Sequence, residues 1–214
     1  MLNKVEIVPA ILVKNREEFL RRIELVKPYV KKVQIDVMDG VFVPNKTIGI
    51  RELRNLPAGM GYEFHWMVNE PEKWIEKIKG DFLHSVHVEA RMDFKKVKEV
   101  AKRNGGRVGL AINPPTPVEM VFPYEKESEE VMVMAVNPGF SNQKYIPQVE
   151  EKIKTLRNRN KDMTISVDGG INVETIGRAA KAGANKFYVA SAIFSAQDIG
   201  RAVEELMNEV KKNG

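Results

Sequence analysis

Side chains that could transfer protons or bind a metal ion stand at the ends of several apolar runs in this chain. One run near the N-terminus contains Gln34 and Asp36, a second contains His65, and a third, in the second half of the chain, ends at Asp168. Carboxylates and imidazoles are common general acids and bases. Oxygen and imidazole ligands without sulfur also suit Zn²⁺, Mn²⁺, Fe²⁺ or Co²⁺.

The spacing of these residues indicates how they could act together. Residues two apart in a strand point to the same face, so Gln34 and Asp36 share a face. In a barrel that face is the inner one if Val33 and Ile35 pack against helices. Carboxylates on two facing strands could remove a proton from one side of a substrate carbon and return one to the other side. A metal ion between them would stabilise the enediolate that forms.

Each of these residues also has a plain structural interpretation. A histidine at a strand end is more often a hydrogen-bonded structural residue than a ligand, and a lone aspartate there can cap the next loop. We interpret Asp39 and Glu89, which follow two of the runs, mainly as residues that hold loops and turns. The gathering of several such groups at one rim is what favours a site.

The elements that must position these residues alternate regularly along the chain. Apolar runs predict strands at residues 5–12, 33–37, 62–68, 83–88, 108–112, 131–136, 164–167 and 186–189. Helical spacing of apolar residues predicts helices at 17–26, 72–79, 94–103, 149–159, 173–182 and 198–211, with shorter ones at 51–56 and 117–122. Asn15 and Asn172 are expected N-caps, and Gly183 stands where a helix ends.

Eight alternations without a linker predict one α/β domain over residues 1–214, a (β/α)8 TIM barrel with a parallel sheet and right-handed crossovers. A doubly wound open sheet is the alternative. In such a barrel the active site lies at the carboxyl ends of the strands, where the polar residues stand.

Composition excludes several classes of function. The chain has no cysteine, which rules out disulfides, thiolate metal sites and cysteine nucleophiles. Its 34 basic and 29 acidic residues are interspersed, which is typical of solvated helix faces rather than of a nucleic-acid site. We find no apolar run long enough to span a membrane and no signal peptide. We therefore expect a cytoplasmic protein with neither nucleic-acid nor membrane partners.

Glycine-containing turns predict a phosphate site. Gly169-Gly170 follows Asp168 and leads into a helix, and Ala190-Ser191 follows the last strand. The turn at residues 137–140 supplies a third loop. Loops after the seventh and eighth strands of barrels commonly bind phosphate through backbone N–H groups.

The chain resembles the ribulose-phosphate 3-epimerase family nearly from end to end. The matching motifs are VPAIL (8–12), DVMDGVFVPNKTIG (36–49), HWMV (65–68), HVEA (87–90), NPPTP (113–117), VMAVNPGF (133–140), VDGGIN (167–172) and ASAIF (190–194). The combination of DVMDG, NPGF and VDGGIN is specific.

The resemblance implies a metal-dependent isomerase of carbohydrate metabolism with a ribulose-phosphate-binding barrel. It would epimerise C3 of a ketose phosphate, D-ribulose 5-phosphate to D-xylulose 5-phosphate, in the pentose phosphate pathway. Asp36 would take the C3 proton and Asp168 would supply one on the other face, and both would bind one divalent metal ion with His65. The floor would be Met38, Met67 and Met134, and the residues holding substrate or phosphate would be His65, Gly139, Phe140, Ser141, Asn142, Gly169, Gly170, Ala190 and Ser191. Family members are commonly homo-oligomers.

The chain departs from the family pattern at positions that would touch metal or substrate. Gln34 stands where the family has a histidine ligand, and an amide oxygen is a poorer ligand for Zn²⁺ than imidazole. Ala10 replaces a serine, Ser141-Asn142 replaces two glycines, and Ala190 replaces another. Three alternatives therefore stay open: an epimerase of another ketose (a hexulose 6-phosphate or an unphosphorylated sugar), a barrel that binds a sugar phosphate without turnover, or another barrel chemistry such as decarboxylation.

Overall fold

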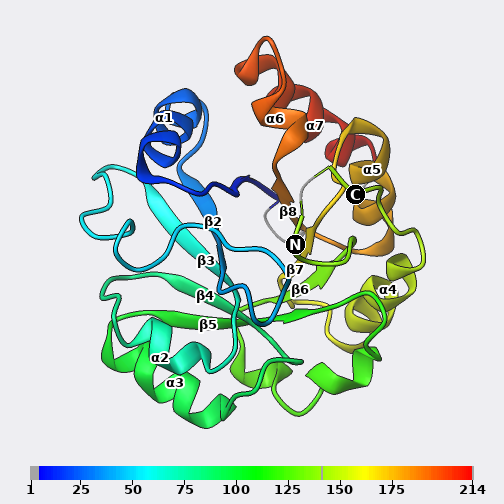
Figure 1. Ribbon diagram of the computed structural model, residues 1–214. Helices are drawn as coiled ribbons and strands as arrows, with labels where there is room; N and C mark the ends of the chain where they lie inside the picture. The colour runs from blue at the N-terminus through cyan, green and yellow to red at the C-terminus, as the bar shows by residue number, and fades with distance from the viewer. Residues whose placement is uncertain (1–4, 141, 214) are drawn as a thin grey trace.

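Eight parallel strands close into a barrel in chain order, with β1 paired to β8 (Figure 1). The computed structural model describes residues 5–140 and 142–213. The strands are β1 (Glu6–Ile11), β2 (Lys32–Met38), β3 (Gly61–Met67), β4 (Leu83–His87), β5 (Arg107–Ile112), β6 (Val131–Met134), β7 (Ile165–Asp168) and β8 (Lys186–Val189). The closed barrel confirms the predicted fold class and makes the open-sheet alternative wrong.

Helices surround the barrel (Figure 1). They are α1 (Arg16–Val26), α2 (Pro71–Ile75), α3 (Phe94–Arg103), α4 (Val149–Arg159), α5 (Val173–Ala182), α6 (Ser191–Phe194) and α7 (Ile199–Asn213), with short 3-10 helices η1 (Val118–Val121) and η2 (Glu125–Glu127). The predicted caps are confirmed: the side chains of Asn15 and Asn172 accept backbone N–H bonds from the first turns of α1 and α5, and Gly183 ends α5 with φ +116°. Within the described residues, no helix has the length and apolarity that crossing a membrane requires.

The predicted helix at residues 51–56 does not form, and a distant arginine supplies the reason. The Arg16 guanidinium donates to the carbonyl oxygens of Glu52, Arg54 and Asn55, the last two at 2.8 and 3.0 Å. Asn55 has φ +55°, which is outside the helical region. Because the carbonyl groups already have a partner, the segment stays a turn.

Many element ends differ from the prediction, most of them by one or two residues. The α2 helix ends at Ile75 rather than at residue 79, the segment after β5 is the 3-10 helix η1, and β6 ends at Met134 rather than at residue 136. Each lies at an element end, where sequence patterns are least precise.

The two faces of β2 show how the barrel positions the chemistry. Val33, Ile35 and Val37 are fully buried in the apolar layer between strands and helices. Gln34 and Asp36 therefore point into the barrel, as the alternation predicts.

The amino end of the barrel interior is filled by a buried ion cluster. Lys186 Nζ lies 2.7 Å from Glu63 and 2.8 Å from Glu130. The Tyr188 hydroxyl lies 2.8 and 2.9 Å from oxygens of the same two glutamates, and it can donate its one hydrogen to either of them. Burial lowers the pKa of Lys186, but the two carboxylates outweigh burial and raise it. The ammonium therefore stays charged and holds the carboxylates in place.

Candidate active site

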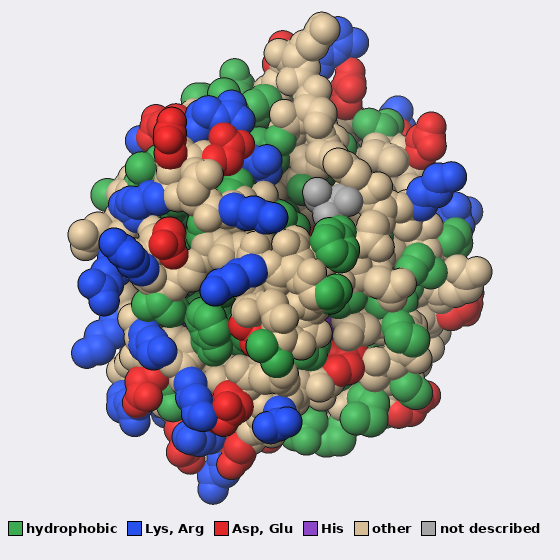
Figure 2. All heavy atoms as spheres, in the orientation of Figure 1, with side chains coloured by type: hydrophobic (Ala, Val, Ile, Leu, Met, Phe, Trp, Pro, Cys, Tyr) green, Lys and Arg blue, Asp and Glu red, His purple; other side chains and the backbone are tan. Residues whose placement is uncertain are grey.

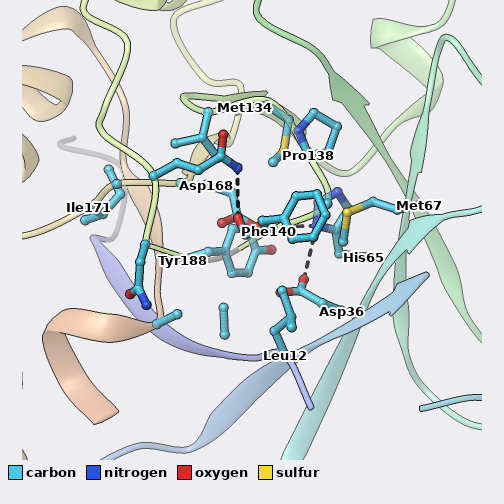
Figure 3. Close-up of a pocket in the computed structure, with 18 of the residues that line it drawn as sticks. Leu12, Asp36, His65, Met67, Met134, Pro138, Phe140, Asp168, Ile171 and Tyr188 are labelled. Carbon is cyan, nitrogen blue, oxygen red and sulfur yellow. Dashed lines mark hydrogen bonds and ion pairs between the residues drawn. The ribbon is translucent and has the colours of Figure 1, made fainter. Parts of the chain in front are cut away.

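An open pocket lies over the carboxyl ends of the strands (Figure 3), with about 610 Å³ of space that includes the adjoining solvent. Thirteen of the predicted site residues line it: Asp36, Met38, His65, Met67, Met134, Gly139, Phe140, Asn142, Asp168, Gly169, Gly170, Ala190 and Ser191. Gln34 is not among the lining residues and is buried. Ser141 lies outside the described residues.

Three charged side chains meet at the bottom of this pocket. Asp36 Oδ1 and Asp168 Oδ2 lie 3.2 and 3.3 Å from His65 Nδ1 (Figure 3). The same two oxygens accept hydrogen bonds from Gln34 Nε2, at 3.0 and 2.6 Å. Gln34 thus bridges the aspartates through its amide N–H groups, and in this arrangement its nitrogen, not its oxygen, faces them.

Electrostatics distinguish these groups. Burial raises the pKa of Asp36 above its usual value, and the charge of Asp168 adds to this, while the hydrogen bond from His65 opposes it. Burial alone would lower the pKa of His65, but hydrogen bonds to Asp168 and Asp36 outweigh burial and raise it to about 9. The imidazole is therefore held as a cation between two carboxylates.

The donor set fits a divalent metal ion. One ligand atom each from Asp36, His65 and Asp168 can be chosen so that all lie within 4.8 Å of one another. All three side chains are at least largely buried, and carboxylate with imidazole suits Zn²⁺, Mn²⁺, Fe²⁺ or Co²⁺. A metal ion here would replace the proton that His65 Nδ1 shares with the two carboxylates.

Behind His65 lies a second histidine that reasoning from sequence left aside. His65 Nε2 and His87 Nε2 are 2.8 Å apart, and His87 Nδ1 lies 3.2 Å from Glu89 Oε2. The other Glu89 oxygen accepts the N–H of Asn113 at 2.8 Å. Glu89 therefore holds a loop, as predicted, and also contacts a residue that reaches the site.

Asp39 has the structural role that the sequence indicates. Its carboxylate accepts the backbone N–H groups of Val41 at 2.7 Å, Phe42 at 2.8 Å and Asn69 at 3.1 Å. These bonds fix the loop after β2. Asn45 in that loop donates to the carbonyl oxygen of Gly139 at 2.6 Å, so the loops after β2 and β6 are joined over the pocket.

The two glycines after β7 are required by packing as well as by conformation. Gly169 has φ +106°, and a Cβ there would lie 2.4 Å from a Val136 methyl. Gly170 has φ +66°, and a Cβ there would lie 2.7 Å from the backbone nitrogen of Tyr145. The turn can therefore approach its neighbours, and a ligand, only with glycine at both positions.

Several residues that line the pocket were not predicted from the sequence. They are Leu12, Ile171 and Tyr188, which are labelled in Figure 3, and Gln143, whereas Pro138 belongs to the predicted turn at residues 137–140. Leu12 and Tyr188 each lie two residues from a predicted departure, Ala10 and Ala190, so strand alternation could have found them.

The face in Figure 2 carries Lys and Arg side chains interspersed with Asp and Glu, as the sequence predicted.

Comparison with known proteins places this geometry in context. The family model described as ribulose-phosphate 3 epimerase matches residues 6–194. The ribulose-phosphate 3-epimerase of Candida glabrata is 36% identical over 200 residues, covering 84% of this chain and 81% of that protein. The Bacillus subtilis protein of the same name is 37% identical, covering 81% and 84%. The Escherichia coli K12 protein is 35% identical, covering 84% of both.

Solved structures share the fold at low identity. The 3-hexulose-6-phosphate synthase of Salmonella typhimurium aligns with a TM-score of 0.73 at 14% identity, over 98% of this chain and 100% of that one. The orotidine 5'-monophosphate decarboxylase of Sulfolobus solfataricus aligns with a TM-score of 0.66 at 12% identity, over 98% and 99%. At such identities the likeness concerns the barrel alone.

Proposed function

The chain belongs to the ribulose-phosphate 3-epimerase family, and from that premise we propose that it interconverts D-ribulose 5-phosphate and D-xylulose 5-phosphate by moving a proton at C3. The observation that carries the proposal is the pair Asp36 and Asp168, which come from facing strands and approach the same imidazole nitrogen. Inverting a carbon needs one group that removes a proton and another that supplies one from the opposite side.

The two aspartates divide this work. Ionised Asp36 takes the C3 proton of ribulose 5-phosphate, and the C–H electron pair moves into the C2 carbonyl to give an enediolate. Protonated Asp168 then gives its proton to the other face of C3, and the roles reverse in the opposite direction. A divalent cation held by Asp36, His65 and Asp168 would supply positive charge for the enediolate oxygens.

The rest of the pocket suits the remainder of the substrate. Met38, Met67 and Met134 give it an apolar, polarizable floor that excludes water from the reacting carbon. The backbone at Gly169, Gly170 and residues 190–191 lines the opposite wall, where N–H groups would hold the phosphate. Gly139, Phe140 and Asn142, on the loop after β6, would close over it.

The test separates proton removal from inversion. Exchange of the C3 hydrogen with D₂O is followed by NMR for ribulose 5-phosphate and xylulose 5-phosphate, with Mn²⁺, Co²⁺ or Zn²⁺ supplied. Asp168→Asn should still exchange the C3 hydrogen of ribulose 5-phosphate through Asp36 but form no xylulose 5-phosphate. Asp36→Asn should show the mirror pattern, exchanging only xylulose 5-phosphate.

Three results would contradict the proposal. Full epimerisation by Asp168→Asn would exclude the two-carboxylate mechanism, and exchange of a hexulose 6-phosphate or a free ketose in preference to ribulose 5-phosphate would exclude the substrate. If no sugar exchanged its C3 hydrogen, the remaining interpretation would be a barrel that binds a sugar phosphate without turnover. Recovery of exchange in Gln34→His would then show that activity was lost because position 34 lacks a histidine ligand. Bound metal is measured for every variant, because both aspartates also belong to the proposed metal site.

A further inference from the structure

A line of hydrogen-bonding groups runs from the rim of the barrel to the far side of the imidazole in the proposed metal site. Glu89 Oε2 lies 3.2 Å from His87 Nδ1, and His87 Nε2 lies 2.8 Å from His65 Nε2. Both imidazoles are fully buried. The ring of Phe42 packs on His87 with centroids 4.9 Å apart. Each ring nitrogen in the line therefore faces one defined partner.

The Glu89 carboxylate at one end determines which ring nitrogen of each histidine in the line is protonated. A carboxylate can only accept, so His87 must carry its proton on Nδ1 to donate to Glu89. The Nε2 of a neutral His87 is then bare and accepts. His65 must in turn carry a proton on Nε2 to donate to it. In neutral His65 this leaves Nδ1 bare, and Nδ1 is the atom that faces Asp36 and Asp168.

We propose that Glu89 is a positioning residue that acts through His87 to hold His65 in the tautomer whose Nδ1 is free to bind a metal ion. The inference rests on the proposed function, because it concerns the metal ion of that site. Metal-bound histidines usually donate their second N–H to a carboxylate or a carbonyl. Here a second imidazole stands between the ligand and the carboxylate.

A glutamine at position 89 would reverse the line. Glu89 accepts from His87, from the N–H of Asn113 at 2.8 Å, and from the side chain of Thr116 in the same loop. A glutamine side chain has only one oxygen, so its amide nitrogen would face His87 while its oxygen keeps Asn113. His87 would then accept at Nδ1 and carry its proton on Nε2, which forces His65 to place its own proton on Nδ1. That proton would occupy the position the metal needs.

The experiment measures Zn²⁺ binding and histidine tautomers in Glu89→Gln. The dissociation constant for Zn²⁺ is measured by competition with a chelator, and we expect it to rise about 10- to 100-fold, the range for lost outer-shell partners. The ¹⁵N shifts of the imidazoles report the tautomers, with and without Zn²⁺. The chain has three histidines. The third, His84, accepts from Trp66 at Nδ1 and serves as an internal reference.

Two control variants separate the tautomer from other effects. Lys152→Met removes the ammonium that donates to the carbonyl oxygens of Asn113 and Thr116, so it loosens the same loop without touching His87. Glu72→Gln makes the same chemical change at another buried carboxylate, on α2. Both should bind Zn²⁺ as the wild type does, and thermal unfolding checks that every variant folds.

The outcomes are distinct. A weaker Zn²⁺ constant and a His87 proton moved to Nε2 in Glu89→Gln alone would support the proposal. An unchanged constant, an unchanged tautomer, or an equal loss in Lys152→Met would overturn it. If the wild type bound no Zn²⁺, the metal in the proposed function would fail. The tautomer of His87 in the metal-free protein would still decide this inference, since Nδ1–H supports it and Nε2–H overturns it.

Discussion

Replacing Gln34 by leucine removes the amide that lies between Asp36 and Asp168 and keeps a side chain of similar size in a buried position. The Gln34 Nε2 group donates to Asp36 at 3.0 Å and to Asp168 at 2.6 Å. Both acceptors are carboxylate oxygens, and the same oxygens face His65 Nδ1. In the metal-free protein, leucine would therefore remove both amide hydrogen bonds and leave His65 as the group that bridges the two carboxylates.

The expected loss of stability follows from these contacts. A hydrogen bond to a charged group contributes about 1.5–3 kcal/mol, so two contribute about 3–6 kcal/mol. Burial of the leucine side chain offsets roughly 1.5–2 kcal/mol of this. The net decrease in the free energy of unfolding is then roughly 1–4.5 kcal/mol, or about 2–18 °C in Tm for a chain of this length.

Metal binding should reduce this difference. A divalent cation neutralises the carboxylates, so the missing amide donors matter less in the loaded protein. Urea unfolding of the wild type and Gln34→Leu, each with EDTA and with saturating Mn²⁺, should show a gap at least halved by the metal. A reduction of about 1.4 kcal/mol corresponds to tenfold tighter Mn²⁺ binding by the variant.

Two results would refute this reasoning. Equal stability of the two metal-free proteins would mean that the amide of Gln34 does not bridge the aspartates. A gap that widens with Mn²⁺ would mean that the amide turns over and Gln34 is itself a metal ligand through its oxygen. Gln34→His serves as the comparison, because an imidazole restores a fourth ligand and should tighten Zn²⁺ binding.

Three further predictions concern the scaffold around the site. Burial lowers the pKa of His84 to about 4. As the pH falls below 6.5, the unfolded chain binds a proton at this histidine before the folded protein does. The contribution of His84 to the free energy of unfolding is therefore fully present above pH 6.5 and falls by about 3 kcal/mol towards pH 4. Urea unfolding across this range should show that slope, and His84→Gln should flatten it. Lys186→Met leaves buried Glu130 without its cation and Glu63 with Lys32 alone, and should cost about 3–5 kcal/mol in guanidinium unfolding. A second change, Glu130→Gln, should recover part of the loss, and no loss at all would contradict the cluster's role. Gly169→Ala places a Cβ against Val136 in a residue with positive φ. This change should lower the free energy of unfolding by about 1–3 kcal/mol and raise KM for the sugar phosphate. An unchanged KM would show that this turn does not touch the substrate.

The barrel and its rim could be predicted from the sequence because both depend on short patterns. Val33 and Ile35 alternate with Gln34 and Asp36, and this alternation alone decides which side chains enter the barrel. The helix expected at 51–56 failed for a reason no local pattern contains. Its carbonyl groups are bound by a guanidinium from α1, and such a long-range partner is known only once the chain is folded.

The hydrogen-bond partners inside the site were the other part that sequence could not supply. Glu89 is a loop holder in the sequence and in the structure, yet one of its oxygens also faces His87. The sequence predicts Gln34 as a weak metal ligand through its amide oxygen, yet in the structure its amide nitrogen faces the aspartates. Both outcomes depend on which neighbour each atom meets across adjacent strands, and strand alternation fixes only the face, not the partner.

The two ends of the barrel interior carry charge in different ways, and the difference explains where chemistry can occur. At the amino end, Lys186 lies between Glu63 and Glu130 and is buried with them, and Lys32 Nζ lies 3.1 Å from Glu63, so the two glutamates meet two cations fixed to the chain. At the carboxyl end, Asp36 and Asp168 have a neutral amide and one imidazole. Even with His65 protonated, this group keeps an excess negative charge beside an open pocket. A fixed ammonium there would satisfy both carboxylates and leave neither able to accept a substrate proton. In the proposed function, this incomplete compensation at the carboxyl end is what would allow this end to bind an exchangeable cation and to move a proton across a sugar carbon.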